Sequence, residues 1–323
     1  MRRTQAKRLP RDRDNTSILS GNAYTLELLR GSDRQCIELM RISREAYVRL
    51  CMHFRHKLLL HDSRHVSVEE KMAMFLTIIG HNKCYVVIKR RFRHSSQTIH
   101  KYIHEVLAAM MTFAREMIVP STFNPNPDYP GAHKSLRRIF KGAVGALDGI
   151  LVHAIIPASQ QTVYRGIGKG KCYQNILGIC DFNMIFFVYA GWEGVAHDSR
   201  VLTEIMAPSN NFPFPSPSKY YLCDAAYTNT REFMAPYRNV RYWLRDFCRR
   251  RAMTKEEEFN HAHAKLRNVI ERAYGVLKAR FPILDKMTPY PFNVQRNVII
   301  ACFAVNNFIR KEKINDELFA QYE

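Results

Sequence analysis

The chain has 323 residues, of which 46% are hydrophobic, and it carries a formal net charge of +20. This length and hydrophobic content suit one large domain or two modest domains with a buried core. No apolar run approaches the roughly 20 residues of a membrane-spanning helix, and the polar start Met1–Pro10 is not expected to be a secretory signal. The clustered positive charge favours a polyanionic partner, most often nucleic acid, over a generically basic soluble protein.

Cysteine usage points to the inside of the cell. Eight cysteines are spread along the chain without a CxxC pair, and several, such as Cys223, lie within apolar runs. This pattern predicts reduced, buried thiols rather than disulfides, and its spacing does not favour a zinc site.

Residues 1–32 are predicted to form a basic, disordered tail. Such a tail suits a nuclear import signal or an arm that touches DNA, and a merely solvated tail is an equal alternative. We therefore expect the protein in the nucleus, with the cytoplasm as a second location.

Residues 33–117 show helical periodicity. Ser67 and Glu70 have the spacing of a capping box, a short helix is predicted at 83–91, and Ser95 is expected to cap a longer helix. Short turns between helices give the outline of a helix-turn-helix unit that binds DNA. An ordinary helical bundle with a basic solvated face is the alternative. The predicted DNA contacts here are Arg90, Arg91, Arg93, Gln97 and Lys101.

Residues 118–140 form a linker whose first part is rich in proline. After it, the helical periodicity gives way to short apolar runs separated by turn residues. Short β-branched runs predict five strands and are followed by two long helices at about 254–280 and 293–311. This order predicts an α/β domain over 141–312 with an RNase H-like mixed five-stranded sheet flanked by helices. Residues 313–323 are expected to be a C-terminal tail. The predicted strands are 142–156, 174–181, 184–190, 219–224 and 240–244.

Three acids stand out by position. Asp148 lies within an apolar strand, Asp224 ends another, and Glu271 lies beside the apolar stripe of a long helix. A buried carboxylate is costly unless it is paired or bound to metal, and clustered carboxylates suit Mg²⁺ or Mn²⁺. Two such ions activate the attacking oxygen and stabilise the leaving oxygen in phosphodiester cleavage. The alternatives are a salt bridge between Glu271 and Arg267, and a turn role for Asp224.

Asp198 is a fourth candidate, as a further metal ligand or as a helix cap, and neighbouring His197 could orient water or only shape the loop. Basic residues surround these acids and are expected to contact DNA phosphates, which predicts salt-dependent binding. The basic glycine loop at 164–171 lacks the full pattern of a nucleotide-binding P-loop. The predicted phosphate contacts are Arg165, Lys169, Arg249, Arg250, Arg267 and Lys278.

These segments resemble the Harbinger (PIF/Harbinger) superfamily of DDE transposases, especially its plant nuclease-like members. The similarity runs from about Cys36 to Arg310. The matching stretches are 145–149 (GALDG), 190–202 (AGWEGVAHDSRVL), 220–227 (YYLCDAAY), 235–238 (APYR) and 266–278 (LRNVIERAYGVLK).

The resemblance implies an RNase H-like nuclease whose catalytic, metal-binding residues are Asp148, Asp224 and Glu271, with Asp198 in a motif that also serves the metal. It further implies action on terminal inverted repeats, a Myb/SANT-like protein partner and a homo-oligomer. The leading hypothesis is therefore a metal-dependent DNA endonuclease or transposase, with strand transfer open.

Ile150–Leu151 stand where the family tends to have a polar Thr-His pair. This departure motivates the alternative of a domesticated transposase that binds DNA or chromatin without catalysis. A nuclease that acts on structured RNA is a third, weaker alternative.

Overall fold

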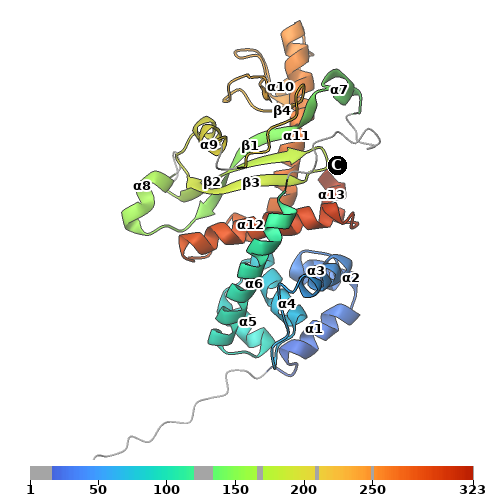
Figure 1. The fold of residues 1–323 in the computed structure, drawn as a ribbon, viewed down its shortest axis with the longest axis vertical. Helices are drawn as coiled ribbons and strands as arrows, with labels where there is room; N and C mark the ends of the chain where they lie inside the picture. Colours follow the sequence, from blue (N-terminus) through green and yellow to red (C-terminus); the bar gives the residue numbers. More distant parts are fainter. Residues whose placement is uncertain (1–16, 120–133, 166–169, 208–210, 249–250, 323) are drawn as a thin grey trace, which may run out of the picture.

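The computed structural model describes residues 17–119, 134–165, 170–207, 211–248 and 251–322. A helical part precedes a sheet with helices on both faces, and the long helix α6 links the two parts (Figure 1). None of the helices described has both the length and the apolar character needed to cross a bilayer. The helical part comprises α1 (Gly21–Arg30), α2 (Asp33–Met40), α3 (Arg44–His56), α4 (Val68–His81), α5 (Tyr85–Phe92) and α6 (Ser96–Met117).

Serine side chains cap five of these six helices; α5 is preceded by Cys84, which makes no side-chain cap hydrogen bond. The predicted caps at Ser67 and Ser95 are confirmed, because each hydroxyl accepts the amide N–H three residues later. Glu70 does not complete the expected capping box. Its carboxylate lies 2.6 Å from His94 Nε2, in the turn before α6. The Ser67 cap therefore begins α4, while Glu70 connects α4 to the turn between α5 and α6.

Both predicted tails contain helices, which corrects the sequence prediction. Ser20 caps α1, and Tyr24 and Leu28 on this helix are buried in the core of the helical part. Helix α13 (Glu317–Tyr322) packs against the long helix α11 (Lys255–Arg280), and Arg272 donates to the Tyr322 carbonyl at 2.8 Å. Both helices gain stability from tertiary packing, which short segments need in order to fold. Residues 1–16 and 120–133 lie outside the described residues.

The sheet has the order β3-β2-β1-β4-β5, with the first three strands antiparallel and β4 and β5 parallel to β1. This is the mixed five-stranded, RNase H-like arrangement that the sequence predicts. The fifth strand was misplaced: residues 244–247 are helical, and the two-residue β5 pairs with β4. The strands are β1 (Ala143–Ala154), β2 (Cys172–Asp181), β3 (Phe186–Glu193), β4 (Tyr220–Leu222) and β5 (Phe233–Met234).

Side-chain alternation along β1 builds a core on each face of the sheet. Ala146 belongs to the core shared with α11 and α12, whereas Leu147 belongs to the core beneath α9. Asp148 follows in the alternation on the α11 face. The remaining helices are α7 (Lys134–Ile139), α8 (Gln161–Tyr164), α9 (Asp198–Ile205), α10 (Leu244–Phe247) and α12 (Phe292–Lys311), with short 3₁₀ turns at Ala158–Gln160 and Pro282–Leu284.

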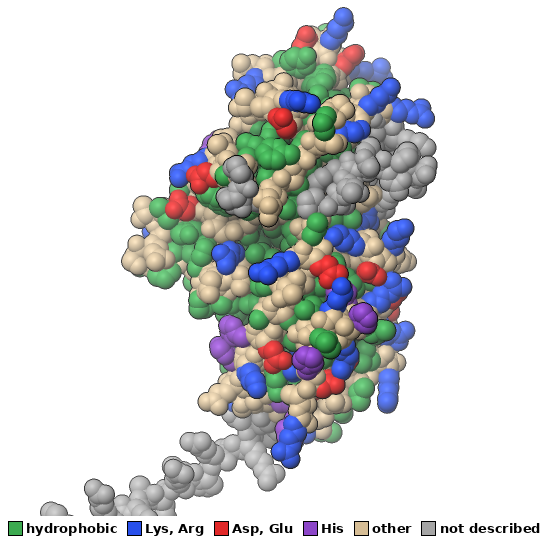
Figure 2. All heavy atoms as spheres, viewed as in Figure 1, with side chains coloured by type: hydrophobic (Ala, Val, Ile, Leu, Met, Phe, Trp, Pro, Cys, Tyr) green, Lys and Arg blue, Asp and Glu red, His purple; other side chains and the backbone are tan. Residues whose placement is uncertain are grey.

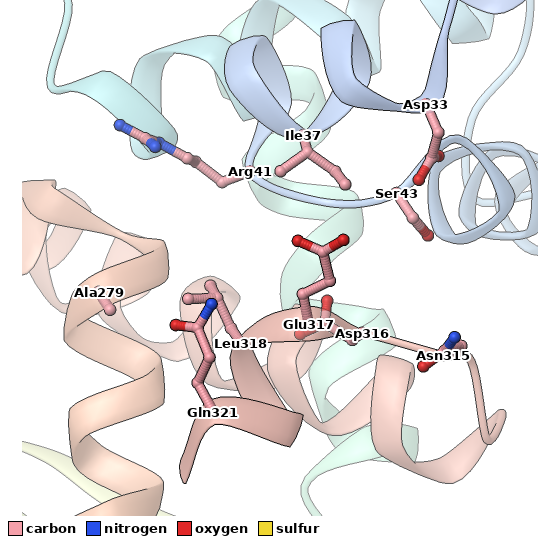
Figure 3. Close-up of a pocket in the computed structure, with 10 residues that line it drawn as sticks. All are labelled: Asp33, Ile37, Arg41, Ser43, Ala279, Asn315, Asp316, Glu317, Leu318 and Gln321. Carbon is pink, nitrogen blue, oxygen red and sulfur yellow. The ribbon is translucent and has the colours of Figure 1, made fainter.

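The helical part and the sheet part share one continuous core, in which α6 packs along α12. Arg280, at the end of α11, stabilises the contact between the helical part and the sheet part. Its buried guanidinium forms two hydrogen bonds with the Asp316 carboxylate, at 2.7 and 2.9 Å, and donates to the Arg41 carbonyl at 2.9 Å. A cavity of about 310 Å³ lies beside this contact, between α2 and the C-terminal helices (Figure 3). None of the four candidate metal-binding acids lines it.

Replacing Arg280 by Met should lower the free energy of unfolding by about 3–5 kcal/mol, because it leaves the Asp316 carboxylate, only 8% exposed, without its partner. Urea denaturation of the full chain measures this change. Arg34→Met is the matched control, since it removes the exposed pair with Glu38 and should have little effect. Equal losses in both variants would contradict the role given to Arg280.

Candidate active site

The parallel pairing of β1 with β4 brings two of the predicted acids together. Ala146 lies opposite Leu222 in this register. Asp148 and Asp224 each follow two residues later, so they lie side by side at the end of the paired strands. Helix α11 packs against β1 and carries Glu271 to the same place.

A buried arginine on α11 connects two of these acids. The Arg267 guanidinium lies 2.8 Å from the Asp148 carboxylate and 2.7 Å from that of Glu271. The Arg267 side chain is 5% exposed, that of Asp148 18% and that of Glu271 50%. The sequence predicted Arg267 as a contact to DNA phosphate, and this needs correction: burial and two ion pairs leave its guanidinium turned inward. The alternative salt bridge to Glu271 is present.

Asp148 carries the main electrostatic cost of the site. Burial raises the pKa of its carboxyl to about 6; Arg267 opposes this rise, and the charges of Asp224, Asp198 and Glu271 add to it. Burial opposes the charged form of Arg267, but the charges of Asp148, Tyr242, Glu271 and Asp224 outweigh it and raise its pKa. Both pKa values can rise together, because the single Arg267 guanidinium is stabilised by several carboxylates while each carboxylate receives only part of its charge. The site therefore holds more buried negative charge than its own cation balances.

Asp198 joins the site from the other face of the sheet, at the first residue of α9. Asn175 on β2 donates a hydrogen bond of 2.6 Å to its carboxylate. Gly149 permits this approach, because a Cβ atom there would lie 2.4–2.5 Å from the carboxylate atoms of Asp198. The cap of α9 is His197, whose Nδ1 accepts the Ser199 amide N–H, so this histidine shapes the loop.

Two tyrosines complete the surroundings, and the sequence interpretation did not include them. The Tyr274 hydroxyl donates to the Asp148 carbonyl at 3.0 Å, which fixes the main chain beneath the carboxylate. The Tyr227 hydroxyl is buried and has no hydrogen-bond partner among the residues that the structure describes. Burial raises its pKa, and the charges of Asp198, Asp148 and Asp224 add to the rise. A signal was available, because each tyrosine follows a predicted acid by three residues on the chain.

The donor atoms fit a divalent cation in kind and in charge. All four acids offer carboxylate oxygens, which Mg²⁺ and Mn²⁺ prefer, and the Tyr227 hydroxyl is an orphaned polar atom beside them. Among the described residues no three His, Cys, Asp or Glu side chains are arranged to hold a metal ion. Asp148 and Glu271 are turned towards Arg267 instead. The site thus has the ligands for a cation, with an arginine among them.

Comparison with known families agrees with this geometry. Residues 147–307 match the family model described as DDE superfamily endonuclease. This segment is a DDE superfamily endonuclease domain. The match includes all four acids and ends within α12. Residues 16–112 match a domain of unknown function (DUF8040). No curated protein and no solved structure matches the chain.

The predicted DNA contacts lie on both sides of the DDE endonuclease domain boundary. On α5, α6 and the turn between them, Arg90, Arg93, Gln97 and Lys101 are exposed, while Arg91 lies 3.2 Å from the centre of the Tyr24 ring. Basic side chains are visible over both parts of the molecule, and histidines gather over the helical part (Figure 2).

Within the endonuclease domain, Arg165 is exposed and Lys278 lies 3.8 Å from Asp285. Lys169, Arg249 and Arg250 lie outside the described residues. Among the predicted contacts that the structure describes, Arg267 is therefore the one turned into the core.

In metal-free buffer, Asp148→Asn should raise the free energy of unfolding by about 1–2 kcal/mol, because it removes a buried charge that neighbouring carboxylates oppose. Urea denaturation in the presence of EDTA measures the change. Asp316→Asn is the matched control: it weakens a two-bond pair with Arg280 and should destabilise the protein. A similar loss in both variants would show that Arg267 more than compensates the Asp148 charge.

Proposed function

We propose that this protein is a divalent-metal-dependent DNA endonuclease or transposase that cuts phosphodiester bonds at transposon-end DNA. The observation that carries the proposal is the β1–β4 register, which sets Asp148 beside Asp224 within a DDE endonuclease domain, under the helix that bears Glu271. The fold is the one that the sequence pattern predicts, and the donor set suits Mg²⁺ or Mn²⁺.

The chain's own residues divide the work. Asp148, Asp224 and Glu271 would hold the cations, with Asp198 as a further ligand; bound Mg²⁺ or Mn²⁺ supplies Lewis-acid activation of the attacking oxygen and neutralises charge on the leaving oxygen. Arg267 holds Asp148 and Glu271 in the site through its two ion pairs. Tyr274 anchors the β1 main chain.

Recognition of DNA is assigned to the basic helical part. The exposed side chains Arg90, Arg93, Gln97 and Lys101 follow α5, the turn and the first turns of α6, as in a helix that reads a groove. The finer relationship to the Harbinger superfamily belongs to this proposal. So do action on terminal inverted repeats, a Myb/SANT-like partner, a homo-oligomer and a nuclear location, with the cytoplasm as a second one.

Two observations favour the alternative of a domesticated, non-catalytic DNA- or chromatin-binding protein. Arg267 forms ion pairs with two of the acids, Asp148 and Glu271, and so supplies part of the positive charge that a metal would bring. In addition, Leu151, beyond Asp148 on β1, is 44% exposed at a position where the resemblance leads one to expect a polar side chain. A binder of this kind keeps its DNA affinity when the acids are replaced.

Purified protein should nick supercoiled plasmid with Mn²⁺ or Mg²⁺, and Asp148→Asn, Asp224→Asn and Glu271→Gln should each lower the rate roughly a hundredfold or more, since a metal-bound oxygen contributes several kcal/mol to the transition state. Asp285→Asn, which replaces an exposed acid, is the matched control.

Nicking that survives in all three acid variants would place the chemistry elsewhere. DNA binding without nicking by the parent, unchanged by the acid substitutions, would support the domesticated binder.

A further inference from the structure

The segment 237–247, between β5 and α11, is held firmly against α11. The Asn260 side chain clamps its main chain, accepting the Tyr237 N–H at 2.8 Å and donating to the Tyr237 carbonyl at 3.0 Å. The Arg241 guanidinium pairs with Glu257 at 3.0 Å. Phe247 stacks on His261, with 4.3 Å between ring centres and 18° between planes. Three residues of α11, Glu257, Asn260 and His261, thus hold this segment in place.

This segment also reaches the carboxylates. Tyr242 is partly buried beside His263, with 3.5 Å between its hydroxyl and Nδ1. Burial raises the pKa of Tyr242 to about 12, and the charges of Arg267, Glu271 and Asp224 all act on it. The phenol therefore forms part of the wall of the candidate active site.

The next residue, Trp243, points its ring outward. Its indole packs edge-on against Tyr242, with 5.9 Å between ring centres, yet the residue is 68% exposed. A large aromatic ring is normally buried, because its apolar surface is costly to hydrate. Here a fixed main chain holds the ring at the rim of the site, so its exposure does not come from a loose loop.

The charges around Trp243 suit a nucleic-acid strand. Arg238 and Arg245 are exposed in the same segment, with Asp246 as an exposed acid among them, and Arg251 is exposed shortly before α11. An aromatic face beside arginines is the usual platform for unpaired bases, since every base has a flat face and the arginines hold the phosphates. A paired base inside a duplex cannot offer its face in this way.

We propose that Trp243 is a stacking site for an unpaired nucleobase of the DNA strand that enters the carboxylate site. This inference rests on the proposed action on DNA. The base would lie on the exposed indole face, while the arginines of segment 237–247 contact the adjoining phosphates. Stacking at this position would favour strands that are frayed or single-stranded next to the bond to be cut.

The chain has two tryptophans, so Trp192→Phe leaves Trp243 as the only indole and as its own reporter. The probes are three DNAs: a blunt duplex, the same duplex with a single-stranded flank, and that duplex with an abasic flank. In EDTA, the flanked duplex should quench Trp243 fluorescence, and the blunt and abasic forms should quench it much less. Trp243→Leu should weaken binding of the flanked duplex about tenfold, as expected for loss of one stacked base.

Three comparisons decide the outcome. Trp243→Leu should leave binding of the blunt and abasic forms unchanged, and Trp243→Phe should keep part of the preference for the flank. Arg245→Gln should weaken flanked and abasic forms alike, because it removes a phosphate contact. Equal affinity of the parent and Trp243→Leu for the flanked duplex, with duplex binding intact, would overturn the stacking site alone. No binding of any of the three DNAs would overturn both the stacking site and the proposed function.

Discussion

The chemistry of the site depends on one buried guanidinium. Four acids converge beside the middle of β1, and Arg267 on α11 lies among them with the opposite charge. Burying carboxylates without compensation is costly, so the position of α11 relative to the sheet is as much an electrostatic requirement as a packing one. Helix α11 carries both Glu271 and Arg267, and the ion pairs of Arg267 with Asp148 and Glu271 lower the free-energy cost of placing these carboxylates in the site.

The sequence predicted the parts of the site that follow from strong local patterns. Asp148 was recognisable because a charged residue interrupts an apolar strand, and the helix carrying Glu271 was recognisable from its periodicity. The relation between them was not predictable, because it depends on strand register and on the angle at which α11 packs. Arg267 was therefore assigned to DNA, although an arginine one turn before Glu271 on a buried helix was equally placed to pair inward.

Errors in the fold arose where tertiary contacts outweigh local preference. The aromatic and β-branched run at 240–244 looked like a strand, but Asn260 and Glu257 hold that segment on α11, and it continues into α10. β5 has only two residues, and its pairing with β4 defines it. Helices α1 and α13 are short and were taken for tails, since what stabilises them is the core and the surface they cover.

The shared core between the helical part and the sheet has a geometric consequence. α6 packs along α12, and Arg280 on α11 pairs with Asp316, next to α13, and donates to the Arg41 carbonyl. Within the described residues, these contacts hold the two parts in a fixed relation. In the proposed function, the protein therefore fixes the distance between the bases that α5 and α6 read and the bond that is cut beside Asp148. Changing that span would require rebuilding the core, whereas changing the sequence that is read would require only new side chains on the surface of α6.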